Sequence, residues 1–243
     1  MTKVALVTGG GRNIGREVCL ALARAGCDVA VNVRTDLAEG EAVAAEVRGL
    51  ARRAIAVAAD VADASAVNAM AGRVKGELGP VQVLVCCAAP RGHVPFLEMS
   101  DEQWHELRGV IVDGAINACG AVIPHMLEAG SGSIVLISGS VAATGTWAHA
   151  AAAKAALHGL ARGLAREFGP RGLRVNVVVP STVATARQKP QSPERVAAVI
   201  AATPLGRHGT PREIADVVAF LAGDMSSFVT GQAIHVNGGQ VMR

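Results

Sequence analysis

The sequence contains no tyrosine, and aromatic residues make up only 2% of its 243 positions. Its core must therefore rely on small aliphatic side chains that pack closely rather than on large rings. No apolar run approaches the about 18 residues that a membrane-spanning helix requires. Lys and Arg are scattered and the net charge is only +3, which indicates neither a nucleic-acid surface nor a membrane surface.

Cysteine is scarce and has no metal-binding arrangement. Five cysteines is an odd number, the spacing matches no metal motif, and two adjacent cysteines are poorly placed to bond to each other. We therefore expect free, mostly buried thiols and no metal site. The chain also runs from Thr2 and Lys3 directly into an apolar segment without a leader pattern, so the expected location is cytoplasmic.

Short β-branched apolar runs alternate with longer stretches of helical spacing along the whole chain. Most of these runs lack in/out alternation, as strands buried on both faces of a parallel sheet do. The order predicts an α/β fold, a doubly wound parallel seven-stranded sheet (Rossmann fold) with helices on both faces, forming one dinucleotide-binding domain over residues 1–243. The expected strands are Lys3–Thr8, Asp28–Val33, Ala54–Ala59, Gln82–Ala88, Ser133–Ser138, Leu173–Val179 and Gln232–Val236.

A glycine-rich segment, Thr8 to Gly15, joins the first expected strand to the first expected helix. Glycine lets the chain turn tightly and brings the backbone close to a pyrophosphate, while the helix start supplies free N–H groups. A flexible strand–helix turn would also be rich in glycine. The position on the first strand–helix turn favours phosphate binding.

This loop resembles the Thr-Gly-x-x-x-Gly-x-Gly fingerprint of short-chain dehydrogenases/reductases, with Asn13 at the middle glycine. Further landmarks follow in order: Asp60-Val61, a Pro180–Thr185 segment with Ser181 in place of glycine, and a final strand with a Gly-Gly turn. The resemblance implies a cofactor site formed by Thr8, Gly9, Gly11, Arg12, Asn13, Ile14, Gly15, Arg34, Asp60, Val61, Ala88, Lys154, Pro180, Val183 and Thr185.

The end of the second strand predicts which dinucleotide binds. An acidic residue there would accept a hydrogen bond from the ribose 2′-hydroxyl of NAD and would repel the 2′-phosphate of NADP. Here Val33 is followed by Arg34, with Arg12 in the glycine loop, and two guanidinium groups suit a phosphate. We therefore expect NADP(H) rather than NAD(H), although both could be solvated surface arginines.

The resemblance also implies a tyrosine that donates a proton, four residues before a lysine that binds the nicotinamide ribose. Lys154 is present, but Ala150 stands at the tyrosine position. Counting from Trp104, the family's relay asparagine appears as Ile111. Its Asn-Asn-Ala-Gly segment reads Cys86 to Ala89.

The sequence leaves the position of the family's catalytic serine open. Strict strand register puts Gly139 at that point, between Ser138 and Ser140, and we favour Ser138. His149 is the candidate substitute acid, because an imidazolium can donate a proton near neutral pH. It could equally be an ordinary histidine at a helix start, capping or solvated. The predicted catalytic set is therefore Ser138, His149 and Lys154.

Three functions remain open. The first is an NADP(H)-dependent oxidoreductase acting on a carbonyl/alcohol pair, resembling 3-oxoacyl-carrier-protein reductases, with a small-molecule or acyl-thioester substrate. The second is an inactive cofactor-binding partner subunit or sensor, and the third is a non-redox lyase or isomerase. The resemblance implies a homotetramer or homodimer. Ser192 and Pro193 predict a helix start beyond the catalytic region.

Overall fold

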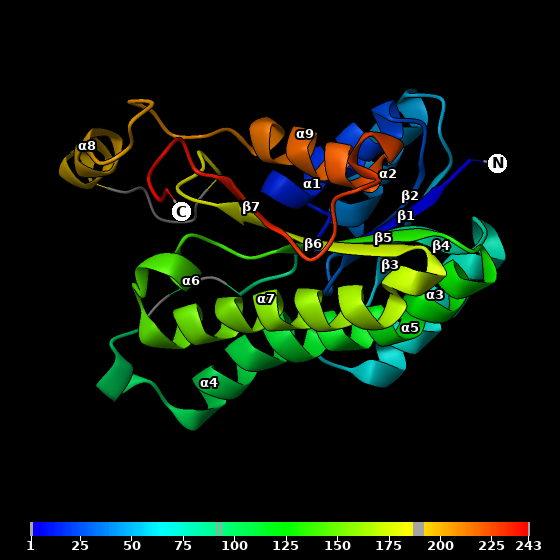
Figure 1. Cartoon of the computed structure of the whole chain (residues 1–243), viewed down its shortest axis with the longest axis horizontal. Helices are drawn as coiled ribbons and strands as arrows, with labels where there is room; N and C mark the ends of the chain where they lie inside the picture. The colour runs from blue at the N-terminus through cyan, green and yellow to red at the C-terminus, as the bar shows by residue number, and fades with distance from the viewer. Residues whose placement is uncertain (1, 91, 93, 187–191, 243) are drawn as a thin grey trace.

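The computed structural model describes residues 2–242 except 91, 93 and 187–191. Its strands form one parallel sheet in the order β3-β2-β1-β4-β5-β6-β7, which confirms the predicted seven-stranded doubly wound fold (Figure 1). Their bounds are β1 Val4–Thr8, β2 Asp28–Val33, β3 Ala54–Ala58, β4 Val81–Cys86, β5 Gly132–Ile137, β6 Leu173–Pro180 and β7 Ala233–Val236.

Most predicted strand ends lie within a residue of the observed ends, and the largest difference is at the end of β4. The expected strand ran to Ala88, whereas β4 ends at Cys86. The amides of Cys87 and Ala88 turn instead toward the Thr8 hydroxyl oxygen, which accepts from them at 3.2 and 3.4 Å. A side-chain acceptor on β1 thus ends the regular ladder of the neighbouring strand.

Helices cover both faces of the sheet. Figure 1 shows α1 (Asn13–Arg24), α2 (Leu37–Gly49) and α9 (Pro211–Ala222) on one face, with α3 (Ala64–Glu77), α5 (Gly114–Glu128) and α7 (Ala148–Phe168) on the other. The remaining α-helices are α4 (Asp101–Arg108), α6 (Val141–Thr144) and α8 (Pro193–Ala201). The last of these begins at Pro193, as predicted.

Local sequence explains several helix starts. Asp36 and Asp63 accept backbone N–H bonds at the starts of α2 and α3, and Ser100 and Thr210 form capping boxes at α4 and α9. Each such cap satisfies donors that the first turn leaves unpaired and contributes about 1 kcal/mol.

The strands are buried on both faces, so the core forms two clusters. Leu6, Leu84 and Ile134 point into the cluster beneath α3, α5 and α7. Their neighbours Val7, Val85 and Val135 point into the cluster beneath α1, α2 and α9. Because successive strand residues face opposite sides, continuous apolar runs are needed to fill both clusters.

Within the described residues, one continuous helical run, Asp101–Glu128, is long and apolar enough to cross a membrane, by length and composition only. Half of its most apolar window is buried inside the protein, and core helices pass the same test. The run combines α4, a π-helical turn (Gly109–Asp113) and α5. No apolar run of about 18 residues was expected in the sequence. Asp113, Asn117 and His125 interrupt this one.

The strand order reverses between β1 and β4, which lie side by side in the middle of the sheet. In open parallel sheets a crevice forms outside the carboxyl ends of the strands at such a reversal, and ligands bind in it. The glycine loop after β1 and the cysteine-containing segment after β4 both begin at this point. The topology therefore places them together.

Candidate active site

The glycine loop has no room for side chains at its key positions. A Cβ added to Gly15 would lie 2.0 Å from the Gly9 carbonyl oxygen, and one added to Gly9 would lie 2.8 Å from Cα of Ala88. Gly9 also has a φ of +64°, which side chains rarely tolerate. Backbone contact this close explains why both positions are glycine.

Asn13 has a left-handed φ of 50° at the middle-glycine position, a conformation that asparagine tolerates better than most residues. Its side-chain oxygen accepts the backbone N–H of Ala186 at 2.9 Å. The glycine loop is thereby linked to the segment after β6.

Helix α1 begins directly at the end of this loop. Within the part of the chain that the structure describes, no side chain caps its first turn, and that turn carries no acidic residue. Ile14 packs against the core cluster beneath α1 and holds the helix in place. An uncapped helix start above a glycine turn is suited to bind an anion such as a pyrophosphate.

Asn32 on β2 orders the loop from the neighbouring strand, a role that sequence reasoning missed. Its side-chain amide donates to the carbonyls of Val33 and Ala59, each at 3.0 Å, and its oxygen accepts from the Gly9 amide at 3.4 Å. The side chain is 1% exposed. One amide side chain within the apolar run 29–33 was the signal that could have identified it.

Arg12 and Arg34 lie on the protein surface, with side chains 62% and 61% exposed. Arg12 lies 3.8 Å from a Glu39 carboxylate oxygen, and Arg34 lies 3.4 Å from one of Glu106. Such exposed pairs contribute about 0–1 kcal/mol, so a doubly charged phosphate could displace either carboxylate.

The expected cofactor residues Asp60 and Val61 follow β3. Asp60 accepts the Ala62 amide at 3.0 Å, which closes a local turn. Val61 is buried, and its carbonyl accepts from the Asn117 side chain at 3.0 Å. A Cβ on Gly114 would lie 2.6 Å from the Val61 side chain, so α5 packs tightly on this pair.

The segment after β6 is anchored by main-chain bonds. Pro180 ends the strand, and its carbonyl accepts the Ser140 amide at 2.8 Å. Val183 is buried and forms a parallel bridge with Gly209. Thr185 follows it, half-buried, just before Ala186. These bonds place the predicted Pro180, Val183 and Thr185 at the same edge of the sheet as the glycine loop.

Lys154 lies at the carboxyl end of β5, where its ammonium donates to the Ile137 carbonyl oxygen at 2.7 Å. Burial lowers the pKa of Lys154 to about 8, while the nearby Cys87 opposes this shift. Ser138 is buried, and its hydroxyl donates to the Lys154 carbonyl oxygen at 3.0 Å. The structure thus brings the predicted Ser138 and Lys154 together.

His158 joins the same cluster and was missed in the sequence. Its Nε2 lies 3.0 Å from the Ser138 hydroxyl oxygen. It follows Lys154 by four residues on α7, so both side chains lie on one helical face. That spacing was the signal that could have drawn attention to it.

His149 is the second residue of α7 and is 5% exposed, so the solvated alternative is wrong. It shares a helical face with Ala153 and Leu157, both in the core. Ala150 instead shares a face with Lys154. The structure therefore places His149 on the face next to the one that carries Lys154.

The remaining altered positions are occupied by small or apolar residues. Ile111 is buried in the π-helical turn between α4 and α5, and such turns occur often at functional sites. All five cysteines are free thiols in the structure, with Cys87 half-buried and the other four buried. Burial raises the pKa of Cys87 to about 11, so it is a weak nucleophile at neutral pH.

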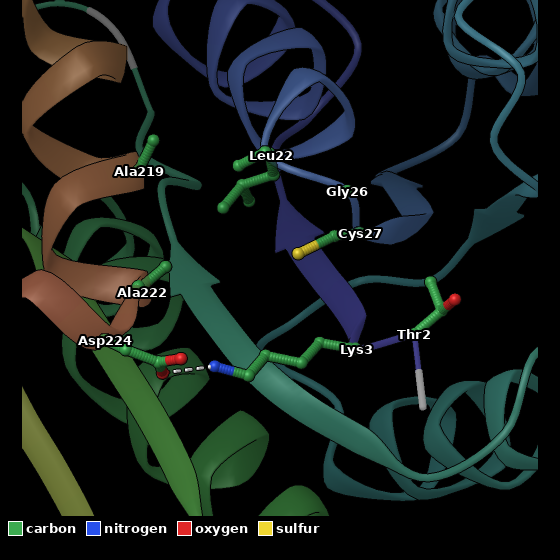
Figure 2. Close-up of a pocket in the computed structure, with 10 residues that line it drawn as sticks. Thr2, Lys3, Leu22, Gly26, Cys27, Ala219, Ala222 and Asp224 are labelled. Atoms are coloured by element: carbon green, nitrogen blue, oxygen red, sulfur yellow. Dashed lines mark hydrogen bonds and ion pairs between the residues drawn. The ribbon is translucent and has the colours of Figure 1, made fainter.

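A surface cavity of about 320 Å³ lies at the opposite edge of the sheet, where the strands begin. Figure 2 shows the Lys3–Asp224 ion pair, at 2.8 Å, along its wall and the Cys27 thiol turned toward the same space. Because dinucleotides bind at the other edge in this fold, the cavity does not belong to the candidate active site.

The fold and this site define a dinucleotide-binding α/β protein. Over residues 9–240 the chain matches the family described as enoyl-(acyl carrier protein) reductase. It is 38% identical to 3-oxoacyl-(acyl-carrier-protein) reductase FabG of Staphylococcus aureus, over 244 residues that cover 100% of this chain and 99% of that protein. The chain therefore belongs to the short-chain dehydrogenase/reductase family of oxidoreductases.

Other similar proteins extend this result. The cyclohexanol dehydrogenase of a Rhodococcus species is 38% identical over 98% of this chain and 95% of its own length. A gluconate 5-dehydrogenase from Burkholderia cenocepacia, solved in complex with NADP and tartrate, superposes with a TM-score of 0.92 at 30% identity. That alignment covers 98% of this chain and 94% of the solved one.

Proposed function

We propose that residues 1–243 form one dinucleotide-binding domain that acts as an NADP(H)-dependent oxidoreductase on a carbonyl/alcohol pair, as an atypical family member without the active-site tyrosine. The observation that carries this proposal is the position of Lys154. Its ammonium lies at the carboxyl edge of the sheet, where the uncapped α1 and the glycine cradle also lie. When bound, the nicotinamide ring supplies or accepts the hydride.

The chain's own residues would bind and orient the reactants. Backbone N–H groups around Gly9 and Gly15 would donate to the pyrophosphate at the start of α1, and Lys154 Nζ would donate to the nicotinamide ribose. A carbonyl that accepts a hydride at carbon also needs a proton at oxygen, and a ring nitrogen of His149 is the proposed donor. Ser138 would support this end of β5.

Lys154 is a second candidate for the proton. Because burial brings the pKa of its ammonium to about 8, it can lose a proton near neutral pH far more readily than an ordinary lysine. Because Ala150 stands at the tyrosine position, no phenol lies between the Lys154 ammonium and a substrate. The two donors are separable by mutation, since they lie on neighbouring faces of α7.

The proposal is tested by NADPH titration followed by an NADPH-oxidation assay with ketones, cyclohexanone and 3-oxoacyl thioesters. For His149→Ala we expect kcat to fall about 10²-fold, the lower end of general-acid effects, while the NADPH Kd stays unchanged. The matched control is His105→Ala, which removes an exposed histidine from α4. An unchanged kcat in His149→Ala would transfer the proton-donor role to Lys154.

A second function has a specific observation in its favour. The positions at which the family resemblance implies a tyrosine donor and a relay asparagine hold Ala150 and Ile111. Both are buried and neither has a titratable group. NADPH binding without turnover on any of these substrates would favour a cofactor-binding partner subunit or sensor. Substrate conversion in the absence of cofactor would instead support the lyase or isomerase alternative, and absence of NADPH binding would exclude both dinucleotide functions.

Selectivity for NADP(H) is expected to depend on Arg12 and Arg34. In the double variant with glutamine at both positions, NADPH should bind about 10- to 100-fold more weakly, since each lost charged contact is worth ~1.5 kcal/mol or somewhat less. NADH affinity should change little. Arg24→Gln, at the far end of α1, is the control for loss of an arginine away from the site. Equal losses for both dinucleotides would show that these arginines do not recognise the 2′-phosphate.

We also propose that the protein is a homodimer or homotetramer. The outward faces of α5 and α7 carry exposed small residues, including Gly120, Ala155, Gly159 and Gly163. Ile116 on the same face of α5 as Gly120 is half exposed. Such faces allow two helices to approach closely, which supports an assembly through these helices. The cytoplasmic location remains a prediction.

A further inference from the structure

Three hydrogen bonds join the end of β5 to a single turn of α7. Lys154 Nζ donates to the Ile137 carbonyl, Ser138 Oγ donates to the Lys154 carbonyl, and His158 Nε2 contacts Ser138 Oγ at 3.0 Å. Ile137 and Ser138 are consecutive, while Lys154 and His158 are one helical turn apart. We propose that Ser138 and His158 are positioning residues that hold Lys154 in its binding geometry.

The hydrogen-bond directions support this assignment. A serine hydroxyl has one proton and accepts through its lone pairs. Since Ser138 gives that proton to the Lys154 carbonyl, the contact with His158 requires Nε2 to carry a proton and donate to Ser138 Oγ. His158 Nε2 therefore donates to Ser138, and Ser138 donates to the Lys154 main chain. This direction requires the Nε2–H tautomer of His158.

Lys154 has a particular need for such support. Its ammonium is held by the Ile137 carbonyl. That bond requires the turn of α7 that carries Lys154 to stay at a fixed distance from the end of β5. Ser138 bonds the main chain of this turn, and His158 contacts Ser138. The resemblance implies a tyrosine one turn before this lysine, but Ala150 provides no hydroxyl there. Ser138, supported by His158 from the following turn, anchors the main chain of Lys154 instead.

This arrangement also changes the expected role of Ser138. Its hydroxyl is directed at α7, and the side chain is only 4% exposed. Ser138 therefore acts through Lys154 and does not touch the reacting carbonyl. The inference rests on the proposed function, in which Lys154 Nζ binds the nicotinamide ribose.

The test compares His158→Leu, His158→Gln and Ser138→Ala with the wild type. We expect His158→Leu and Ser138→Ala to raise the NADPH Kd about tenfold, equivalent to ~1.4 kcal/mol. His158→Gln retains a donor at a position similar to Nε2 and should restore binding, which a general packing role would not predict. The control is His125→Leu, which removes a buried histidine from α5 and should leave the Kd unchanged.

Two further readouts use the cofactor-free protein. Ring ¹⁵N NMR should find the Nε2–H tautomer of His158, and acetylation of Lys154, followed by mass spectrometry, should be faster in His158→Leu than in the wild type. If the wild type fails to bind NADPH but these two results hold, the proposed function fails and the positioning role stands. If NADPH binds and neither the Kd nor the acetylation rate responds to His158→Leu or Ser138→Ala, the inference is overturned.

Discussion

Gly15→Ala is expected to reduce dinucleotide affinity at least about 100-fold, or ~2.8 kcal/mol. The added methyl group would lie 2.0 Å from the Gly9 carbonyl oxygen and also within 3.0 Å of Cα of Gly10, so it meets backbone that cannot rotate away. The loop must open or α1 must shift. Either change separates the uncapped helix start from the glycine turn that would hold the pyrophosphate.

The measurement is fluorescence titration with NADPH and with NADH, beside urea unfolding of the same variant. Both dinucleotides should lose affinity together, because the pyrophosphate is common to them. The matched control is Gly72→Ala on the exposed side of α3, where a Cβ meets nothing within 4 Å. That change should stabilise the protein by up to about 1 kcal/mol and leave both affinities unchanged. A folded Gly15→Ala variant with normal affinity would contradict the proposal that the glycine loop holds the pyrophosphate.

Lys154→Met is expected to stabilise the protein by about 1–2 kcal/mol at pH 7 while weakening NADPH binding. Burial lowers the pKa of Lys154 from 10.5 to about 8, so the folded protein holds the lysine proton less tightly than the unfolded chain does. Every tenfold loss of proton affinity on folding costs about 1.4 kcal/mol while the lysine stays charged. Methionine removes this cost, although it also leaves the Ile137 carbonyl without its 2.7 Å donor and so forfeits part of the gain.

The gain should disappear with rising pH. Between about pH 8 and 10.5 the folded wild type has released the Lys154 proton while the unfolded chain still binds it. The unfolded state then binds more protons, so wild-type stability rises with pH through this window relative to the variant. Urea unfolding at pH 7 and pH 9.5 measures the effect.

Lys75→Met is the control for loss of a lysine, because Lys75 of α3 is exposed and pairs with Glu128 at the end of α5. A Lys154→Met variant that is less stable than the wild type at pH 7, by an amount that does not change with pH, would show that the Lys154 ammonium is not desolvated. The expected combination of higher stability with weaker NADPH binding would then also be wrong.

Much of the fold could be predicted because it depends on local patterns. The strands between Val4 and Val236 appeared as continuous apolar runs, and their alternation with helical spacing predicted the parallel sheet. The end of β4 was missed because the Thr8 hydroxyl, 79 residues away, takes the Cys87 amide. When a distant side chain ends the hydrogen-bond ladder of a strand, the hydrophobic periodicity of the sequence does not show it.

The candidate site could be predicted in part. The glycine loop and Lys154 have fixed spacings, so their positions followed directly from the sequence. Asn32 and His158 were missed because each acts through contacts with another element, the glycine loop in one case and the end of β5 in the other. The side on which His149 lies became clear only when α7 was found to begin at Ala148.

By itself, the sequence determined the sheet, the glycine turn and the absence of a tyrosine hydroxyl, since these depend on residue type and spacing along the chain. The tertiary structure alone decided which groups surround Lys154, which way Ser138 donates and how far burial lowers the lysine pKa. Those properties depend on strand register and on water excluded by distant residues. Local pattern carries no information about either.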